Sequence, residues 1–242
     1  MKRIRVAAHV HSEWSYDGRW TLQQISEAFG RRGYDAVLLA EHDRGFDATR
    51  WAEYRAACDS VTAGARLVPG IEYSDPTNSV HVPVWGDIPF LGEGLGTAEL
   101  LPAAKAAGGV AVLAHPGRRD VGRTLDRALL HHFTGIEIWN RKYDGWAPNR
   151  RALAYARESG LAPFVSLDFH SARQFFPLAM ELSVGGPVTR ATVQQALHAG
   201  EFQALAFSRS ALRMASGVAG VGLVAAEVAR SAAARAFRAL RS

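Results

Sequence analysis

Short apolar runs rich in β-branched residues alternate with helical patterns along most of the chain. The strand-like runs lie at residues 4–8, 36–40, 66–69, 80–85, 110–113, 135–139, 162–167 and 203–207. The helical patterns between them lie at residues 21–31, 48–63, 97–107, 125–132, 148–159 and 190–199. Repeated β-α alternation with mostly short links predicts an α/β fold built on a parallel sheet.

The chain has 242 residues, enough for one large α/β domain or two small ones with a substantial core. Its single cysteine, Cys58, rules out an intramolecular disulfide and a metal site built from several thiolates. The apolar part of the N-terminus is too short for a signal peptide, since polar residues begin at His9. We therefore expect a cytoplasmic protein, whose oligomeric state the sequence leaves open.

The formal net charge of +5 is concentrated in the C-terminal segment. Residues 209–242 hold six arginines and one acid, Glu227, so residues 1–208 are neutral overall. We expect residues 1–208 to form the α/β body and residues 209–242 a basic, alanine-rich extension with one helix over 221–240. Packing of that helix on the body or on a partner subunit is favoured over a membrane-surface role. Arg213 and Glu227 interrupt its apolar part, which argues against a membrane span.

Nine imidazole or carboxylate side chains follow the predicted strands, almost all at the C-terminal ends, and all suit divalent metals. They are His9, His11, Asp17, His42, Glu72, His81, His115, Asp168 and His170. His81 is the exception, because it begins its strand, which we expect to run antiparallel or to lie in an excursion. One rim of a closed or nearly closed β/α barrel gathers such ends. A tetrahedral zinc site uses about four ligands, so this set predicts two or three ions.

Each motif has an ordinary structural explanation when taken alone. Asp17 before Gly18 suits a turn, and Asp168-x-His170 suits a salt bridge. His9 and His11 face the same way, because alternate residues on a strand do. Five strand ends that all carry ligand-type side chains are improbable by chance, so a metal site is favoured. In contrast, His131, His132 and His198 lie in predicted helices and are interpreted as surface or packing residues.

The order HxH, Asp, EH, GxE, His, AHP, DxH over residues 4–172 resembles the PHP (polymerase and histidinol phosphatase) family. The resemblance implies a distorted (β/α)7 barrel, TIM-like, with a trinuclear site of manganese, zinc or iron. It implies three ligand sets: His9, His11, Glu72 and Asp168; Glu72, His81 and His115; Asp17, His42 and His170. The chain departs from the commonest family spacing by one extra residue before Asp17, most simply Tyr16, and by Ala40-Glu41 and Ser166-Leu167 in place of the usual pairs.

Clustered divalent ions activate water and neutralise phosphoryl oxygens, which predicts hydrolysis of a phosphate ester. Arg118 is the first candidate to bind the substrate phosphate, followed by Arg141 and Lys142 and then by Arg19 and Arg44. Asp43, Glu41 and Glu137 are candidates to orient ligand imidazoles. Four aromatic residues near loop ends could stack a ring, although packing is the commoner role: Trp14, Tyr16, Trp139 and Trp146.

The leading functional hypothesis is a metal-dependent phosphoesterase acting on a small phosphomonoester or a nucleotide. The neutral body favours a small substrate over long duplex, while the basic tail keeps a nuclease acting on short oligonucleotides open. An amidohydrolase-type enzyme is a second alternative, although none of Lys2, Lys105 and Lys142 is well placed inside a strand to bridge metals. A non-catalytic metal-binding module is the third.

Overall fold

The structure is a computed structural model that describes residues 1–118, 121 and 125–239. Its strands form two six-stranded sheets, in the orders β12-β11-β10-β1-β2-β4 and β3-β5-β6-β7-β8-β9. The first sheet contains Lys2–Val10 (β1), Ala36–Leu39 (β2), Arg66–Val68 (β4), Leu178–Val184 (β10), Phe202–Ala206 (β11) and Arg209–Ser210 (β12). The second contains Glu41–His42 (β3), Gly70–Ser74 (β5), His81–Trp85 (β6), Val110–Leu113 (β7), Gly135–Asn140 (β8) and Ala162–Ser166 (β9).

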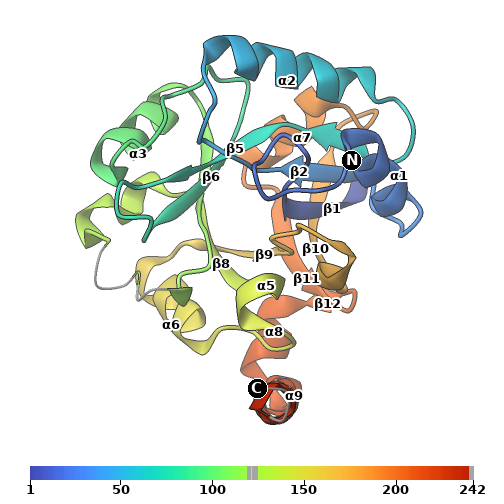
Figure 1. The fold of residues 1–242 in the computed structure, drawn as a ribbon, viewed down its shortest axis with the longest axis vertical. Helices are drawn as coiled ribbons and strands as arrows, with labels where there is room; N and C mark the ends of the chain where they lie inside the picture. Colours follow the sequence, from blue (N-terminus) through green and yellow to red (C-terminus); the bar gives the residue numbers. More distant parts are fainter. Residues whose placement is uncertain (119–120, 122–124, 240–242) are drawn as a thin grey trace.

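The helices surround these sheets (Figure 1). They are Leu22–Gly30 (α1), Ala48–Ser60 (α2), Thr97–Ala106 (α3), Arg141–Asp144 (α5), Arg150–Ser159 (α6), Arg190–His198 (α7), Ala211–Ser216 (α8) and Val218–Ala239 (α9). Ala172–Gln174 (η3) is a short 3-10 helix. Thr21 opens α1 with a capping box to Gln24, which satisfies donors that the first turn leaves free.

The chain passes from the first sheet to the second at two places where a single residue separates the strands. These places lie between β2 and β3 and between β4 and β5. The end of β1 is also joined to the segment after β9. Phe169 N donates to His9 O at 3.0 Å, and His11 N donates to Phe169 O at 2.9 Å. The expected α/β architecture is confirmed in this form, and the two sheets meet where the ligand candidates lie.

The expected parallel sheet is mixed, which corrects the sequence prediction. β10 is antiparallel to β1 and β11, and it was not predicted. Its sequence, LAMELSV, is made largely of good helix formers, but the pairing with β1 overrides that propensity. β6 is antiparallel to β5 and β7, with His81 opposite Ser74. The start of β6 therefore lies at the rim where β5 ends, as expected for His81.

Two further predictions differ from the structure at the helices. The predicted helix over 125–132 is a 3-10 helix, Arg127–His132 (η2), which begins where Asp126 accepts a hydrogen bond from Ala128 N. The predicted C-terminal helix over 221–240 begins earlier, at Val218, and its last predicted residue lies outside the described residues. None of the helices within the described ranges is long and apolar enough to span a membrane.

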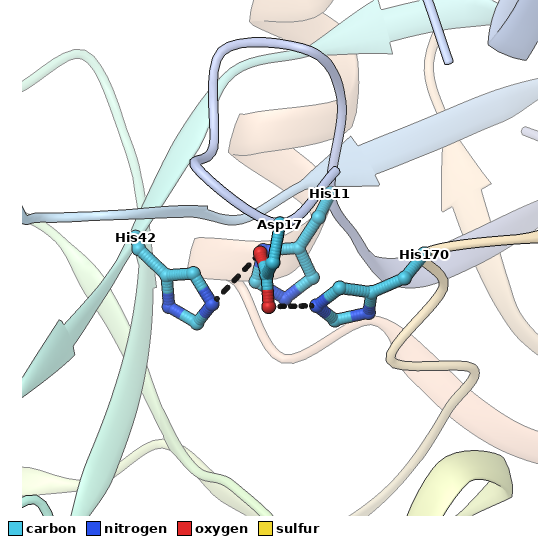
Figure 2. Close-up of side chains that lie close together, drawn as sticks. All are labelled: His11, Asp17, His42 and His170. Carbon is cyan, nitrogen blue, oxygen red and sulfur yellow. Dashed lines mark ion pairs between the residues drawn. The ribbon is translucent and has the colours of Figure 1, made fainter. Parts of the chain in front are cut away.

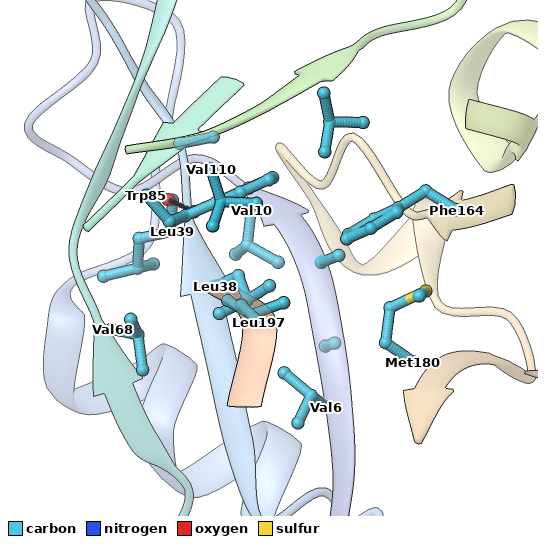
Figure 3. Close-up of a cluster of buried hydrophobic side chains, with 14 of the residues drawn as sticks. Val6, Val10, Leu38, Leu39, Val68, Trp85, Val110, Phe164, Met180 and Leu197 are labelled. Atoms are coloured by element: carbon cyan, nitrogen blue, oxygen red, sulfur yellow. Dashed lines mark hydrogen bonds between the residues drawn. The ribbon is translucent and has the colours of Figure 1, made fainter. Parts of the chain in front are cut away.

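A continuous apolar core supports the strands beneath the rim (Figure 3). The rings of Trp85 and Phe164 stack with centroids 6.2 Å apart, and Trp85 Nε1 donates to Leu39 O at 2.6 Å. Gly70 faces this ring, where a Cβ would collide with Trp85. Burial of each such side chain contributes roughly 1.5–3 kcal/mol, so the core fixes the strand ends that carry the polar residues above it.

Candidate metal centre

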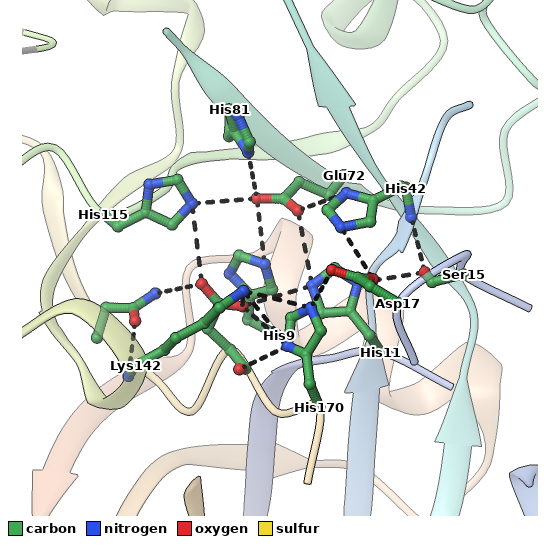
Figure 4. A network of polar contacts seen from close by, with 12 residues as sticks. His9, His11, Ser15, Asp17, His42, Glu72, His81, His115, Lys142 and His170 are labelled. Atoms are coloured by element: carbon green, nitrogen blue, oxygen red, sulfur yellow. Dashed lines mark hydrogen bonds and ion pairs between the residues drawn. The ribbon is translucent and has the colours of Figure 1, made fainter. Parts of the chain in front are cut away.

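The structure brings all nine candidate ligands together at one rim (Figure 4). His9, His42, Glu72 and His81 lie within strands, and Asp17 lies on the loop between β1 and α1. The remaining four lie within a few residues after a strand end: His11, His115, Asp168 and His170. Seven of the nine are buried, and Asp17 and His170 are half-buried. Segments far apart in the sequence thus converge because parallel strand ends meet at one edge.

Glu72 lies at the centre of the cluster, and its buried carboxylate faces five imidazole rings (Figure 4). The distances from its oxygens to the ring nitrogens are 3.2 Å for His9 Nε2, 3.6 Å for His11 Nε2, 3.1 Å for His42 Nδ1, 3.0 Å for His81 Nδ1 and 3.2 Å for His115 Nε2. One carboxylate that faces so many ring nitrogens has the position of a bridging ligand.

The ligand atoms form three groups, and the atoms of each group all lie within 4.8 Å of one another. They are His11, Asp17, His42 and His170 (Figure 2); His9, His11 and Glu72; and Glu72, His81 and His115. The groups parallel the three sets that the resemblance implies, except that His11 also approaches the Asp17 group. Asp168 lies beside them, with Oδ1 3.6 Å from His11 Nε2 and Oδ2 3.9 Å from His115 Nε2.

The donor set fits divalent cations. Among the described residues, four buried ligand atoms have no hydrogen-bond partner: His9 Nε2, His11 Nε2, His115 Nδ1 and Asp17 Oδ1. A buried polar atom without a partner costs free energy, roughly 1–3 kcal/mol. Imidazole nitrogens and carboxylate oxygens that face one another at 3–4 Å, several of them without a hydrogen-bond partner, are suited to share a metal ion.

Three of the nine residues have left-handed backbone conformations. The φ angles are 60° for His9, 27° for His115 and 46° for Asp168. A register shift between Ala8 and Val10 accompanies the conformation of His9. Such irregularities re-aim side chains, and they persist where the surroundings impose them, often at functional sites. The backbone at these strand ends is therefore shaped to turn the ligands inward.

The electrostatics of the cluster balance imidazoles against carboxylates. Burial lowers the pKa of His42, but Asp17 and Glu72 outweigh it and raise that pKa to about 10. Burial likewise opposes protonation of His9, yet Glu72, Asp168 and Glu137 raise its pKa well above the usual range. Burial and the neighbouring His42 lower the pKa of His11. The carboxylates thus stabilise positive charge within the cluster, and bound divalent ions would supply such charge.

Glu137 orients the ligands on one side of the cluster. Its Oε1 lies 2.8 Å from His9 Nδ1, and its Oε2 accepts from His115 N and from Asn140 Nδ2, each at 2.8 Å. The predicted orienting role of Glu137 has this geometry, because a hydrogen bond at Nδ1 leaves Nε2 free to face Glu72.

The other two predicted orienting acids contact different groups. Glu41 accepts from Ser12 Oγ and Ser15 Oγ at 2.6 Å, and Ser15 Oγ in turn lies 3.3 Å from His11 Nδ1. Glu41 therefore supports the His11 loop through serine. Asp43 accepts from Gly94 N at 2.8 Å and holds a neighbouring loop.

Two cationic side chains of the described residues reach the cluster. Arg118 Nη1 lies 2.5 Å from His81 Nε2, and Lys142 Nζ lies 3.0 Å from Asp168 Oδ1. Arg19 is exposed on the loop that carries Asp17. Arg141 faces another way, because its guanidinium lies 5.1 Å from the centre of the Phe176 ring. Of the adjacent pair 141 and 142, the lysine is the one that faces the ligands.

Two tyrosines pack on ligand histidines at opposite ends of the cluster. The Tyr16 ring stacks on His42 with centroids 4.8 Å apart, and Arg44 lies 5.8 Å from the Tyr16 ring centre. The Tyr143 ring lies 4.5 Å from that of His115. Trp139 is buried in the core, and Trp14 packs on Tyr54, so both have packing roles. Sequence reasoning assigned no role to Tyr143 or Asn140, although an asparagine at the end of a strand is a helix-cap signal.

No family profile matches the sequence, and no curated protein sequence does. Solved structures do resemble it. A two-domain protein from Bacteroides vulgatus ATCC 8482, described as containing a predicted PHP-like metal-dependent phosphoesterase, is 20% identical with a TM-score of 0.62. The alignment covers 85% of this chain and 65% of that one, so this chain spans less than two thirds of that protein.

Two other structures extend the likeness. PsfC from Pseudomonas syringae PB-5123 is 16% identical with a TM-score of 0.65, over 96% of this chain and 99% of that chain. The lesion-specific endonuclease Q from Pyrococcus furiosus is 12% identical with a TM-score of 0.56, over 82% and 56% respectively. At these identities the matches establish the fold. The predicted resemblance is confirmed at that level, since the chain has the fold of PHP-like phosphoesterases.

Proposed function

We propose that the chain is a metal-dependent phosphoric ester hydrolase whose body is a distorted (β/α)7 barrel with two or three divalent ions at its rim. The observation that carries the proposal is the buried Glu72 carboxylate, which faces ring nitrogens of five histidines. A single tetrahedral zinc ion uses four ligands, so a carboxylate that faces five imidazoles fits several ions that share it. Manganese, zinc and iron all suit this donor set.

The nine ligands would hold the ions in the three groups described above. When bound, such ions supply Lewis acidity and a water nucleophile active near neutral pH. The chain's own residues do the remaining work. Glu137 holds His9 in the tautomer that leaves Nε2 unprotonated toward Glu72, and the Ser15–Glu41 contact holds the His11 loop.

We propose that Arg118 and Lys142 bind the phosphoryl oxygens of the substrate. Both cations lie at the cluster from different elements, beside His81 and beside Asp168. Their positive charge would hold a dianionic phosphate against the rim and offset the charge that develops in the reaction. Arg19, on the exposed loop near Asp17, stays a prediction. Arg141 is left out of the proposal because it faces Phe176.

A small phosphomonoester or a nucleotide is the favoured substrate class, because the body carries no net charge. The fold likeness to an endonuclease that acts on damaged DNA supports the alternative of a short nucleic acid substrate. The amidohydrolase alternative is weaker, since Lys2 begins β1, Lys105 lies in α3 and Lys142 lies in α5. None of the three is placed inside a strand at the rim.

The test is phosphate release by manganese-loaded protein from a panel of phosphoesters. The panel contains nucleoside mono- and bisphosphates, histidinol phosphate, sugar phosphates and short RNA. The proposal expects turnover of at least one class by the wild type, and its loss in His42→Ala. His198→Ala is the matched control, because His198 is exposed on α7. Bound metal with no turnover of any ester would instead favour a non-catalytic module.

A further inference from the structure

Helix α5 delivers Lys142 and Tyr143 to the metal centre, yet it has only the four residues Arg141–Asp144. A helix this short is not stable alone, since its nucleation cost exceeds its hydrogen-bond gain. Its N-terminal end is held by Asn140, whose Oδ1 accepts from Lys142 N at 3.0 Å and from Tyr143 N at 3.2 Å. The position of α5 therefore depends on contacts with the residues around it, at this end and in the turn that follows Asp144.

At the C-terminal end of α5, Asp144 accepts from Asn140 N and Asn149 Nδ2, each at 2.8 Å, and the turn that follows is held by the tail helix α9. Gly145 follows α5 with φ 69° and ψ −125°, a conformation that favours glycine, and its carbonyl accepts from Trp139 Nε1 at 3.2 Å. The next residue, Trp146, donates its backbone N–H to Glu227 Oε2 at 2.9 Å. A Cβ on Gly145 would collide with the Glu227 carboxylate, so the turn and the tail are in direct contact.

Glu227 lies at the middle of the face by which α9 packs on the body. The less exposed positions of α9 are Gly220, Leu223, Val224, Glu227, Arg230, Ser231 and Ala234, which is the spacing of one helix face. Glu227 is itself fixed by Arg230, whose Nε donates at 2.8 Å, and by Ser231 Oγ at 2.7 Å. Figure 1 shows α9 beside α8, at the end of the molecule where α5 lies.

We propose that Glu227 is a positioning residue, which docks the C-terminal helix on the Gly145–Trp146 turn and thereby holds Lys142 and Tyr143 at the metal centre. The catalytic consequence rests on the proposed function. Glu227, the one acidic residue of the basic segment 209–242, then links helix α9 to the turn beside Lys142 and Tyr143. Without it, the Trp146 N–H loses its acceptor, and α5 is left with the contacts of Asn140 and Asp144 alone.

Hydrogen exchange tests the coupling without any need for turnover. In the full-length, metal-free chain, Glu227→Ala should speed amide exchange of the segment 140–146 by roughly tenfold or more, as expected when a charge-assisted hydrogen bond is lost. Glu227→Gln, which keeps an acceptor oxygen for Trp146 N–H, should have a smaller effect. Arg235→Ala is the control, because Arg235 is exposed on the same helix. Unchanged exchange at 140–146 in Glu227→Ala overturns the proposal.

Kinetics then test whether the anchor acts through Lys142. If the wild type turns over a phosphoester, Glu227→Ala should raise KM by about threefold to tenfold, while Arg235→Ala should leave it unchanged. In a Lys142→Ala background, Glu227→Ala should add much less, because the two residues act on one contact. Full additivity of the two substitutions overturns the positioning role even if exchange increases. A wild type without turnover refutes the proposed function but leaves the exchange result to decide the docking.

Discussion

Replacing Glu137 with glutamine should weaken metal binding, although the two side chains have nearly the same shape. Glu137 accepts on both oxygens: Oε1 faces His9 Nδ1, and Oε2 accepts from His115 N and Asn140 Nδ2. An amide has only one acceptor oxygen and one donor nitrogen. In one orientation its NH2 group faces two donors. In the other it faces His9 Nδ1 and forces the proton onto Nε2, the atom that faces Glu72.

Either orientation damages the centre, and the expected size follows from related sites. Loss of a residue that orients a metal-bound histidine typically lowers metal affinity or activity about 10–100-fold, equivalent to about 1.4–2.7 kcal/mol. The assay is titration of metal-free protein with zinc or manganese against a chelator of known affinity. Glu158→Gln serves as the control, since Glu158 is exposed on α6. Equal affinities for wild type and Glu137→Gln would refute the argument that Glu137 sets the His9 tautomer.

Further predictions concern the substrate cation, the histidine charge and the core. Lys142→Met should raise KM for a turned-over phosphoester by about tenfold or more, because a charge-assisted contact to phosphate is lost; an unchanged KM would exclude the contact. In the metal-free protein the raised His42 pKa, about 10 against an ordinary 6.5, means that its ion pairs stabilise the fold fully below pH 6.5 and progressively less toward pH 10. Urea unfolding of chelator-treated protein should therefore show a loss of stability as pH rises through this range, and a constant or rising stability would contradict the assignment. Leu38→Ala should lower the free energy of unfolding by about 2–5 kcal/mol, because Leu38 is fully buried; a loss below about 1 kcal/mol would show that the core relaxes around the cavity.

The ligand set could be predicted because it depends on local pattern and on one topological rule. Residues at the ends of consecutive parallel strands meet whatever the details of the loops, so His9, His42 and His115 could be placed together from sequence. His81 could be placed at the same rim if its strand ran antiparallel, because the strand then begins where its neighbours end. Trp85 and Gly70 illustrate why the apolar runs could be recognised, since both serve a core that the strand pattern already implied.

Other features depend on contacts between distant residues, which no local pattern records. β10 has a helix-forming composition and becomes a strand only because β1 and β11 pair with it. The short helix α5 is capped by Asn140, and the turn that follows it contacts Glu227, 87 positions from Asn140 in the sequence. The same dependence explains why Lys142 rather than Arg141 faces the cluster, because the turn of α5 decides which neighbouring cation points inward.

The most direct test of the metal centre is anomalous diffraction from crystals of the protein soaked with manganese or zinc. The account predicts two or three anomalous peaks about the Glu72 carboxylate, with ligands drawn from His9 and His11, from His81 and His115, and from Asp17, His42 and His170. A rim without anomalous peaks, or ions bound only at surface residues away from Glu72, would contradict it.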